Sequence, residues 1–179
     1  MIYDNHNTFY YKPNQPVMTI HAMSEVHARS LCDWRYEPPW DSYNWPAWEN
    51  MKKDAIEFGD PVLRASQYAV VLDKHQSLVG YVQFFPMGNV TRLGLGLHPE
   101  RIGQGLGSHF VHTLALEALR RCPDHEIDLE VASWNIRAIR AYERAGFRIE
   151  DTYLRPSPSG EIECHCMVFH PAGLSVGKD

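Results

Sequence analysis

The sequence predicts a mixed α/β fold in a single domain, and three observations lead to this prediction. Apolar and polar residues alternate in several short stretches, as they do in half-buried strands. Around residues 104–121, Leu106, Phe110, Leu114 and Ala118 share one face of an amphipathic helix. The 179 residues are 44% hydrophobic and 22% charged, which allows one sizeable core and argues against a disordered chain.

The first half of the chain predicts a strand and two helices around an irregular segment. Residues 34–50 hold four of the five tryptophans together with three prolines, and proline interrupts regular structure. The predicted elements are a strand over 17–23, a helix from its N-cap Ser24 to about Trp34, and a helix over about 47–58 that Gly59 and Pro61 end.

The second half of the chain predicts most of one mixed sheet, which about four helices flank in all. Gly94 and Gly96 interrupt the strand at 90–97, which indicates either a bulge or a close approach to the backbone. Residues 171–179 are expected to form a loose tail. The predicted elements are a hairpin of 67–72 and 78–85, a strand at 90–97, a helix from about Gln104 to Arg121, a strand at 126–132, a helix at 136–145 closed by Gly146, and a hairpin of 147–155 and 161–169.

Charge and hydropathy exclude several classes of protein. The chain has 17 Lys and Arg against 22 Asp and Glu, a net charge of −5, which disfavours binding to nucleic acid or to an anionic membrane. No apolar run approaches the roughly 20 residues needed to cross a bilayer. Residues 1–14 lack the apolar region of a signal peptide. We therefore expect a cytoplasmic protein without membrane or nucleic-acid partners.

The segment Cys164-His165-Cys166 raises the question of a metal site. Metal-binding cysteines normally stand at least two residues apart and are joined by a second pair of ligands elsewhere. The segment also alternates as a strand, which would point Cys164 and Cys166 to the same side. We predict strand thiols and no metal.

The most informative segment is residues 97–108, LHPERIGQGLGS, where a strand ends and a glycine-rich turn opens the long helix. Gly103, Gly105 and Gly107 leave main-chain N–H groups unobstructed, and a helix N-terminus carries partial positive charge. The turn is therefore suited to phosphate or pyrophosphate. Its spacing matches neither the dinucleotide fingerprint G-x-G-x-x-G nor the Walker pattern G-x-x-x-x-G-K-[ST].

A second motif runs from Trp134 to Gly146-Phe147 and includes Asn135, Ala138 and Tyr142. Ala138 and Tyr142 lie four residues apart and share a helical face. Taken alone, Asn135 could serve only as a helix N-cap, and Tyr142 only as an amphipathic core residue.

Together, the two motifs resemble the acetyl-CoA-binding segments of the GNAT N-acetyltransferase superfamily, and the resemblance spans about residues 17–170. Leu97-His98-Pro99 stands for V-x-P and 104–107 for the core of the loop, but Ile102 replaces the usual Gln or Arg. The resemblance implies a mostly antiparallel, splayed sheet with acetyl-CoA as co-substrate. The cofactor-binding residues it implies are Leu95, Leu97, Ile102, Gly103, Gln104, Gly105, Leu106, Gly107, Ser108 and Asn135.

The resemblance also suggests how the catalytic groups are distributed. Acetyl transfer to nitrogen needs a neutral amine, a stabilised oxyanion and a proton for the departing thiolate. Tyr142 is the candidate acid, with a role in merely orienting the sulfur as the alternative. Glu130 is the strand candidate for the base, and Glu37, Asp41 or a water relay are alternatives. The residues expected to bind the substrate are Tyr36, Glu37, Trp40 and Asp41, although the aromatics of this loop could instead simply pack on the core.

We therefore expect an acetyl-CoA-dependent N-acetyltransferase that acts on a primary amine, either a protein N-terminus or a small-molecule amine. The branch that acetylates ribosomal-protein alanine looks most similar, while aminoglycoside and other small-amine branches share the same motifs. A non-catalytic acyl-CoA-binding or sensing module is the alternative. Members of the family often dimerise, so the resemblance also implies a homodimer.

Overall fold

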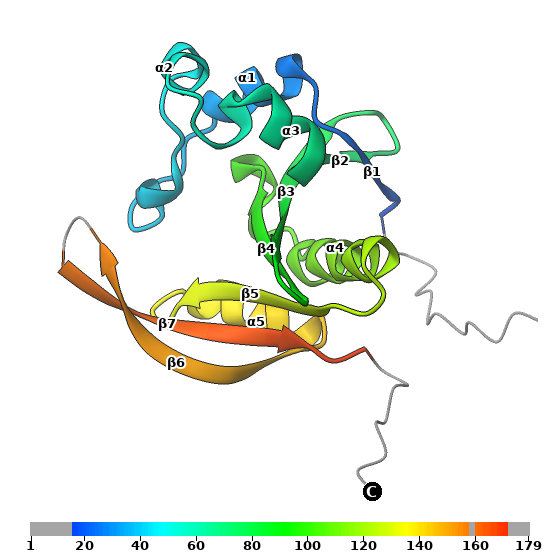
Figure 1. Cartoon of the computed structure of the whole chain (residues 1–179), viewed down its shortest axis with the longest axis vertical. Coiled ribbons are helices and arrows are strands. Elements are labelled where there is room, and N and C mark those ends of the chain that lie inside the picture. Colours follow the sequence, from blue (N-terminus) through cyan, green and yellow to red (C-terminus); the bar gives the residue numbers. More distant parts are fainter. Residues whose placement is uncertain (1–15, 158–159, 172–179) are drawn as a thin grey trace, which may run out of the picture.

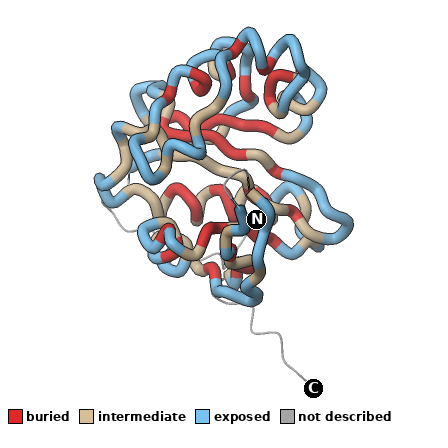
Figure 2. The backbone as a smooth tube through the Cα atoms, turned by 90° about the vertical axis from the view of Figure 1, so that its left-hand side faces the viewer, coloured by how far each residue is buried: buried red, intermediate tan, exposed pale blue. Residues whose placement is uncertain are grey.

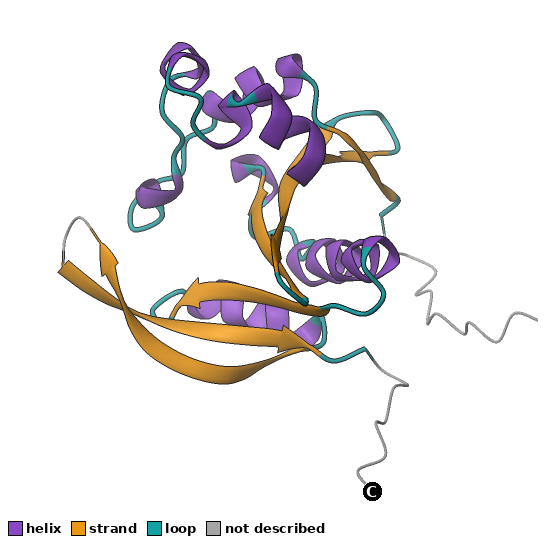
Figure 3. Ribbon diagram, in the orientation of Figure 1, coloured by secondary structure: helices purple, strands orange, loops and turns teal. Residues whose placement is uncertain are grey.

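The computed structural model describes residues 16–157 and 160–171, which form one seven-stranded sheet (Figures 1 and 3). The strand order is β1-β2-β3-β4-β5-β7-β6, and every neighbouring pair is antiparallel except β4 with β5. The predicted mixed, mostly antiparallel sheet is confirmed. The strands are β1 (Met18–Ala22), β2 (Tyr68–Asp73), β3 (Leu78–Met87), β4 (Val90–Leu97), β5 (Glu126–Ala132), β6 (Phe147–Ser157) and β7 (Gly160–Phe169).

Helices cover both faces of the sheet because successive side chains of its central strands point to opposite sides. In β2, Ala69 and Val71 pack with the core under α4, whereas Tyr68 and Val70 pack with α1 and α2. Figure 2 shows the buried residues concentrated along these inner strands. The helices are α1 (Glu25–Cys32), α2 (Trp48–Lys53), α3 (Pro61–Gln67), α4 (Gly107–Arg121) and α5 (Ile136–Arg144), with 3₁₀ turns η1 (Asp41–Tyr43), η2 (Glu57–Gly59) and η3 (Pro99–Arg101).

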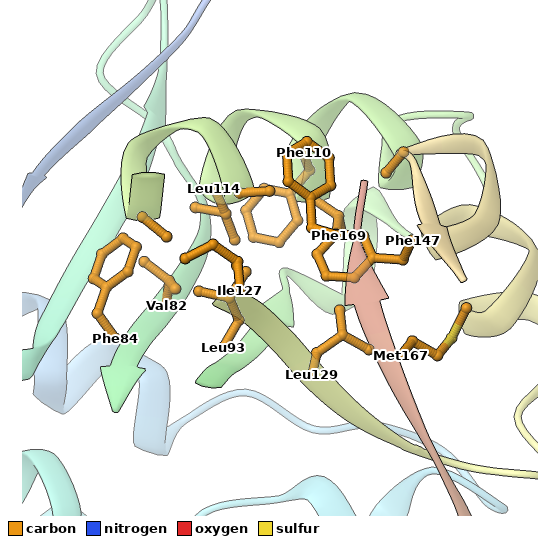
Figure 4. Packing of buried hydrophobic residues seen from close by; sticks show 14 of the residues in the cluster. Val82, Phe84, Leu93, Phe110, Leu114, Ile127, Leu129, Phe147, Met167 and Phe169 are labelled. Atoms are coloured by element: carbon orange, nitrogen blue, oxygen red, sulfur yellow. The ribbon is translucent and has the colours of Figure 1, made fainter. Parts of the chain in front are cut away.

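The larger core lies between α4 and the sheet (Figure 4). Phe110 and Leu114 project from α4 toward Leu93 of β4 and Ile127 of β5, and all four are almost inaccessible to solvent. Because this core contacts both β4 and β5, it holds the two strands together where they pair.

Residues 16–157 and 160–171 contain five α-helices where about four were expected, and α3 is the addition. Pro61 was predicted to end a helix, but it begins one. Asp60 is the N-cap, and its Oδ1 accepts hydrogen bonds from the N–H groups of Val62 at 2.6 Å and Leu63 at 3.2 Å. Proline suits the first helical turn because its missing N–H would have no partner there.

Two further corrections concern glycines. The long helix begins at Gly107 rather than Gln104, because Gly103 and Gly105 have positive φ angles of 83° and 76°. The β3–β4 register is continuous through Gly94 and Gly96, so the bulge alternative is wrong. The close-approach alternative is confirmed, since a Cβ on Gly96 would lie 2.3 Å from the ring of Tyr81.

The sheet opens between β4 and β5. The two strands pair at three positions only, the last being Arg92 with Asp128, and then diverge (Figure 1). The Arg92 guanidinium donates two hydrogen bonds to the Asp128 carboxylate, from Nε at 3.0 Å and from Nη2 at 2.5 Å. This bidentate ion pair holds the strands together at the point where they separate.

Several predictions about the chain ends fall outside the part that the structure describes. These are the absence of a signal peptide in residues 1–14 and, apart from Pro171, the loose tail at 171–179. Within residues 16–157 and 160–171, no helix has the length and apolar character required to cross a membrane.

Candidate active site

A cleft of about 690 Å³ occupies the opening between β4 and β5. Its walls come from the second half of β4, the turn at 102–108, one face of α5, part of β5, and the loop between α1 and α2. The fold thus places both sequence motifs and the loop between α1 and α2 around one cleft.

The glycine turn forms one end of this cleft. Gly103 and Gly105 have the left-handed backbone that L side chains rarely adopt, and a Cβ on either would point into open space. The next residue, Leu106, caps α4 without a side-chain hydrogen bond, so the first N–H groups of the helix are left for a ligand. Donors without side-chain partners on a helix N-terminus fit a pyrophosphate.

Not every residue of the predicted loop faces the cleft. Ile102, Leu106 and Ser108 line it together with Gly103, Gly105 and Gly107. Gln104 does not line it, since its Nε2 donates a hydrogen bond to the carbonyl oxygen of Glu100 at 2.7 Å. Ile102 places an apolar side chain where a polar one was expected.

The main chain of β4 forms a second wall. The N–H of His98 donates to Val79 of β3, and main-chain direction alternates along a strand. The N–H and C=O groups of Leu95 and Leu97 therefore point away from β3 and into the opening. The hydroxyl of Tyr36 donates to the carbonyl oxygen of Leu97 at 2.9 Å, so this loop reaches the end of the strand.

Helix α5 supplies Asn135 and Tyr142 to the opposite wall. The Asn135 Oδ1 accepts a hydrogen bond from the N–H of Ala138 at 3.4 Å as the N-cap of the helix, and it also contacts Trp40. Tyr142 lines the cleft, and its hydroxyl has no hydrogen-bond partner among the residues that the structure describes. Burial raises the pKa of Tyr142 above its usual range, which keeps the phenol protonated.

The loop between α1 and α2 closes over this wall. The Nε1 of Trp40 donates to Asn135 at 3.4 Å, and the Arg137 guanidinium lies 4.1 Å from the centre of the Trp40 ring. Its neighbours Glu37 and Asp41 are exposed and lie outside the cleft lining. The structure therefore brings Tyr36 and Trp40 to the site, and it does not bring the two carboxylates.

Glu130 lies in the cleft, but its carboxylate is surrounded by partners. Arg155 lies 2.7 Å from Oε1 and Arg92 lies 3.6 Å from Oε2, and the Tyr153 hydroxyl also donates to Oε2. Both carboxylate oxygens of Glu130 are therefore already engaged by protein side chains.

A group of cleft residues was not found from the sequence. They come from four separate segments of the chain, so no local sequence motif contains them. We call this group the aromatic pocket; its members are Trp45, Glu57, Tyr68, Tyr81 and Gln83.

The tyrosines of the cleft predict how stability depends on pH. Burial raises the pKa of Tyr81 to about 12, and burial also raises the pKa values of Tyr36, Tyr68 and Tyr142. Below pH about 10 both folded and unfolded chains keep these protons; above it the unfolded chain loses them first. The free energy of unfolding should therefore fall above pH 10, by about 1.4 kcal/mol per tyrosine for each pH unit. Urea titrations at pH 8, 10 and 11 measure this, and Tyr81→Phe should reduce the slope; a flat profile would contradict the prediction.

Comparison with known proteins agrees with this geometry. Residues 24–147 match the family model described as "Acetyltransferase (GNAT) family". A spermidine N-acetyltransferase from Vibrio cholerae, solved in complex with CoA and spermine, superposes with a TM-score of 0.65 at 17% identity, over 85% of this chain and 94% of that one. A GNAT-family acetyltransferase from Bacillus anthracis gives a TM-score of 0.66 at 15% identity, over 85% and 93% of the two chains. These likenesses show the shared fold, and the family match shows that the chain belongs to the GNAT acetyltransferase family.

Proposed function

We propose that this acetyltransferase moves an acetyl group from acetyl-CoA to a primary amine, which is a protein N-terminus or a small-molecule amine. The supporting observation is that one cleft holds a glycine turn suited to pyrophosphate and a tyrosine hydroxyl without a partner in the described part of the chain. A non-catalytic acyl-CoA sensor would need the turn but not the tyrosine.

Acetyl-CoA supplies the reactive thioester when it is bound. In the proposal, the N–H groups of Gly103, Gly105 and the first turn of α4 hold the pyrophosphate. The main chain of Leu95 and Leu97, together with the side chain of Asn135, positions the pantetheine arm. The N–H groups of β4 at this position can also stabilise a carbonyl oxyanion.

Tyr142 is proposed to donate its phenolic proton to the departing sulfur. A thiol has a pKa near 8.5, below that of an ordinary phenol near 10. A full transfer in water would therefore be uphill, but a positioned donor can share its proton as negative charge develops on sulfur. The raised pKa keeps Tyr142 in the protonated form that this role requires.

The identity of the base is tied to the acceptor. A lysine amine with a pKa near 10.4 costs on the order of 4.6 kcal/mol to deprotonate at pH 7, whereas an α-amine near 7.8 costs about 1 kcal/mol. Because both oxygens of Glu130 are engaged by protein side chains, we propose that it takes up the proton through a relay of water rather than by direct contact with the amine. A protein N-terminus would need the least help from such a base.

Free thiol release with a panel of amines tests the proposal. The panel comprises a peptide with a free N-terminal alanine, a lysine side chain, an aminoglycoside and, since a protein of similar fold is a spermidine acetyltransferase, a polyamine. Turnover on one class would identify the acceptor. Binding of acetyl-CoA with no turnover on any amine would favour the sensing alternative. Absence of acetyl-CoA binding would contradict the assignment of the glycine turn as the pyrophosphate site. A homodimer and a cytoplasmic location remain predictions.

A further inference from the structure

The aromatic pocket combines one carboxylate with several rings. The ring of Trp45 lies 4.9 Å from that of Phe58 and 6.1 Å from that of Tyr81, and Phe58 lies 5.5 Å from Tyr68. The Nε1 of Trp45 donates to the Tyr81 hydroxyl at 3.2 Å. The rings therefore support one another, and they present a rigid apolar surface around Glu57.

Within the described residues, hydrogen bonds rather than an ion pair hold the carboxylate of Glu57. Its Oε2 accepts hydrogen bonds from the Tyr68 hydroxyl at 2.5 Å and from Gln83 Nε2 at 3.3 Å. Burial and the carboxylate raise the pKa of Tyr68, so the phenol keeps its proton and acts as the donor. Within the described part of the chain, no Lys, Arg or His side chain forms an ion pair with Glu57, in contrast to Glu130.

The two donors occupy one oxygen of this carboxylate. In the same part of the chain, Oε1 of Glu57 has no hydrogen-bond partner, and the residue is half-buried in the cleft wall. A partly desolvated carboxylate beside aromatic faces is an environment that favours a cation, because both the charge and the ring quadrupoles attract it.

The pocket adjoins the strand expected to hold the acetyl donor. Gln83 pairs with Gly94 across β3 and β4, and a Cβ on Gly94 would lie 3.3 Å from Oε1 of Gln83. The Gln83 side chain thus spans the distance between Glu57 and β4, next to Leu95. Glu57 therefore lies close to the strand whose main chain is proposed to hold the pantetheine arm.

We propose that the aromatic pocket is the acceptor subsite and that the Glu57 carboxylate binds the ammonium group of the incoming amine. The protein would then select acceptors that arrive as cations. This inference rests on the proposed function, because it names the chemical group that the acceptor site recognises. Binding of that group can nevertheless be measured without turnover.

Calorimetry in the presence of CoA, which lacks the acetyl group, tests the binding directly. The probes are n-butylamine, which is a cation at pH 7, and 1-butanol, a neutral molecule of similar shape. Wild-type protein should bind the cation at least tenfold more tightly than the alcohol. Glu57→Gln should weaken binding of the cation about tenfold and leave binding of CoA unchanged.

Two control variants separate the charge from the structure around it. Glu49 is an exposed carboxylate on α2, outside the cleft, and Glu49→Gln should bind the cation as the wild type does. Tyr68→Phe removes one donor but keeps the Glu57 carboxylate, so it should weaken binding of the cation less than Glu57→Gln does. Melting temperatures identify any variant that fails to fold, and the wild-type comparison of the two probes still tests the inference in that case.

The outcomes distinguish this inference from the proposed function. Equal affinity of the wild type for the cation and the alcohol would overturn the acceptor subsite, as would equal affinity of wild type and Glu57→Gln for the cation. A cation preference that depends on Glu57, without turnover of any amine, would support the acceptor subsite and contradict the proposed acetyl transfer. With turnover, Glu57→Gln should raise the KM for an alkylamine about tenfold and leave the KM for acetyl-CoA unchanged.

Discussion

Replacing Tyr142 with phenylalanine is expected to lower kcat about 100-fold, the lower end of the range for loss of a general acid. The hydroxyl of Tyr142 is the group available for this role, since it lines the cleft and has no hydrogen-bond partner in the described chain. Other tyrosines of the cleft wall have partners within the protein. The hydroxyls of Tyr36 and Tyr68 donate to Leu97 and Glu57, that of Tyr81 accepts from Trp45, and that of Tyr43 is hydrogen-bonded to Asn135. Thiol release at saturating acetyl-CoA and amine measures the effect.

A second donor separates the acid role from an orienting role. An acetyl ester of p-nitrophenol has a leaving group that needs no proton, so the loss caused by Tyr142→Phe should largely disappear with it. If Tyr142 only orients the sulfur, the variant should instead raise the KM for acetyl-CoA and keep kcat within about threefold. That result would contradict the acid role. The variant removes one oxygen atom, so its melting temperature should stay close to that of the wild type.

The residues that sequence reasoning located are those held in continuous motifs. The glycine turn lies between β4 and α4, whereas Asn135 precedes α5 and Tyr142 lies within it, so each motif is carried to the cleft by one short continuous segment. The predicted strands 90–97 and 126–132 agree with β4 and β5, because alternation of apolar and polar side chains is typical of strands.

Local signals failed where one residue type has two structural meanings. Pro61 both ends a preceding helix and suits the first turn of a following one, and Asp60 before it is the signal that distinguishes the two. Gly103 and Gly105 directly precede α4, and the sequence alone does not show where this helix begins. Their positive φ angles exclude them from it.

The aromatic pocket was beyond sequence reasoning for a different reason. Glu57 belongs to a short 3₁₀ turn and has a positive φ of 48°. Of its two partners, Tyr68 is the first residue of β2 and Gln83 lies within β3. The contact between Glu57 and Gln83 depends on the β2–β3 register and on the path of the chain before α3. Such a site becomes visible only when the tertiary structure is known.

Gly105→Ala is expected to weaken acetyl-CoA binding about 30-fold, the second largest effect. The left-handed backbone at Gly105, with φ 76°, costs an L residue roughly 1–2 kcal/mol, so the turn should shift to relieve the strain. A shift would misdirect N–H groups proposed to face the pyrophosphate. Losing one hydrogen bond to a charged group costs about 1.5–3 kcal/mol, and each 1.4 kcal/mol is tenfold in affinity. Calorimetric titration with acetyl-CoA measures the change.

Gly88 provides a matched control, because it isolates backbone strain from ligand binding. It has a similar φ of 63° in the β3–β4 turn, a Cβ there would also meet nothing within 4 Å, and it lies outside the cleft. Gly88→Ala and Gly105→Ala should therefore lower the melting temperature by similar amounts, while only the second weakens binding. If both variants bound acetyl-CoA as tightly as the wild type, the N–H groups of the turn would not be the pyrophosphate site. If both weakened it equally, the effect would come from global destabilisation, and the role of Gly105 would again be wrong.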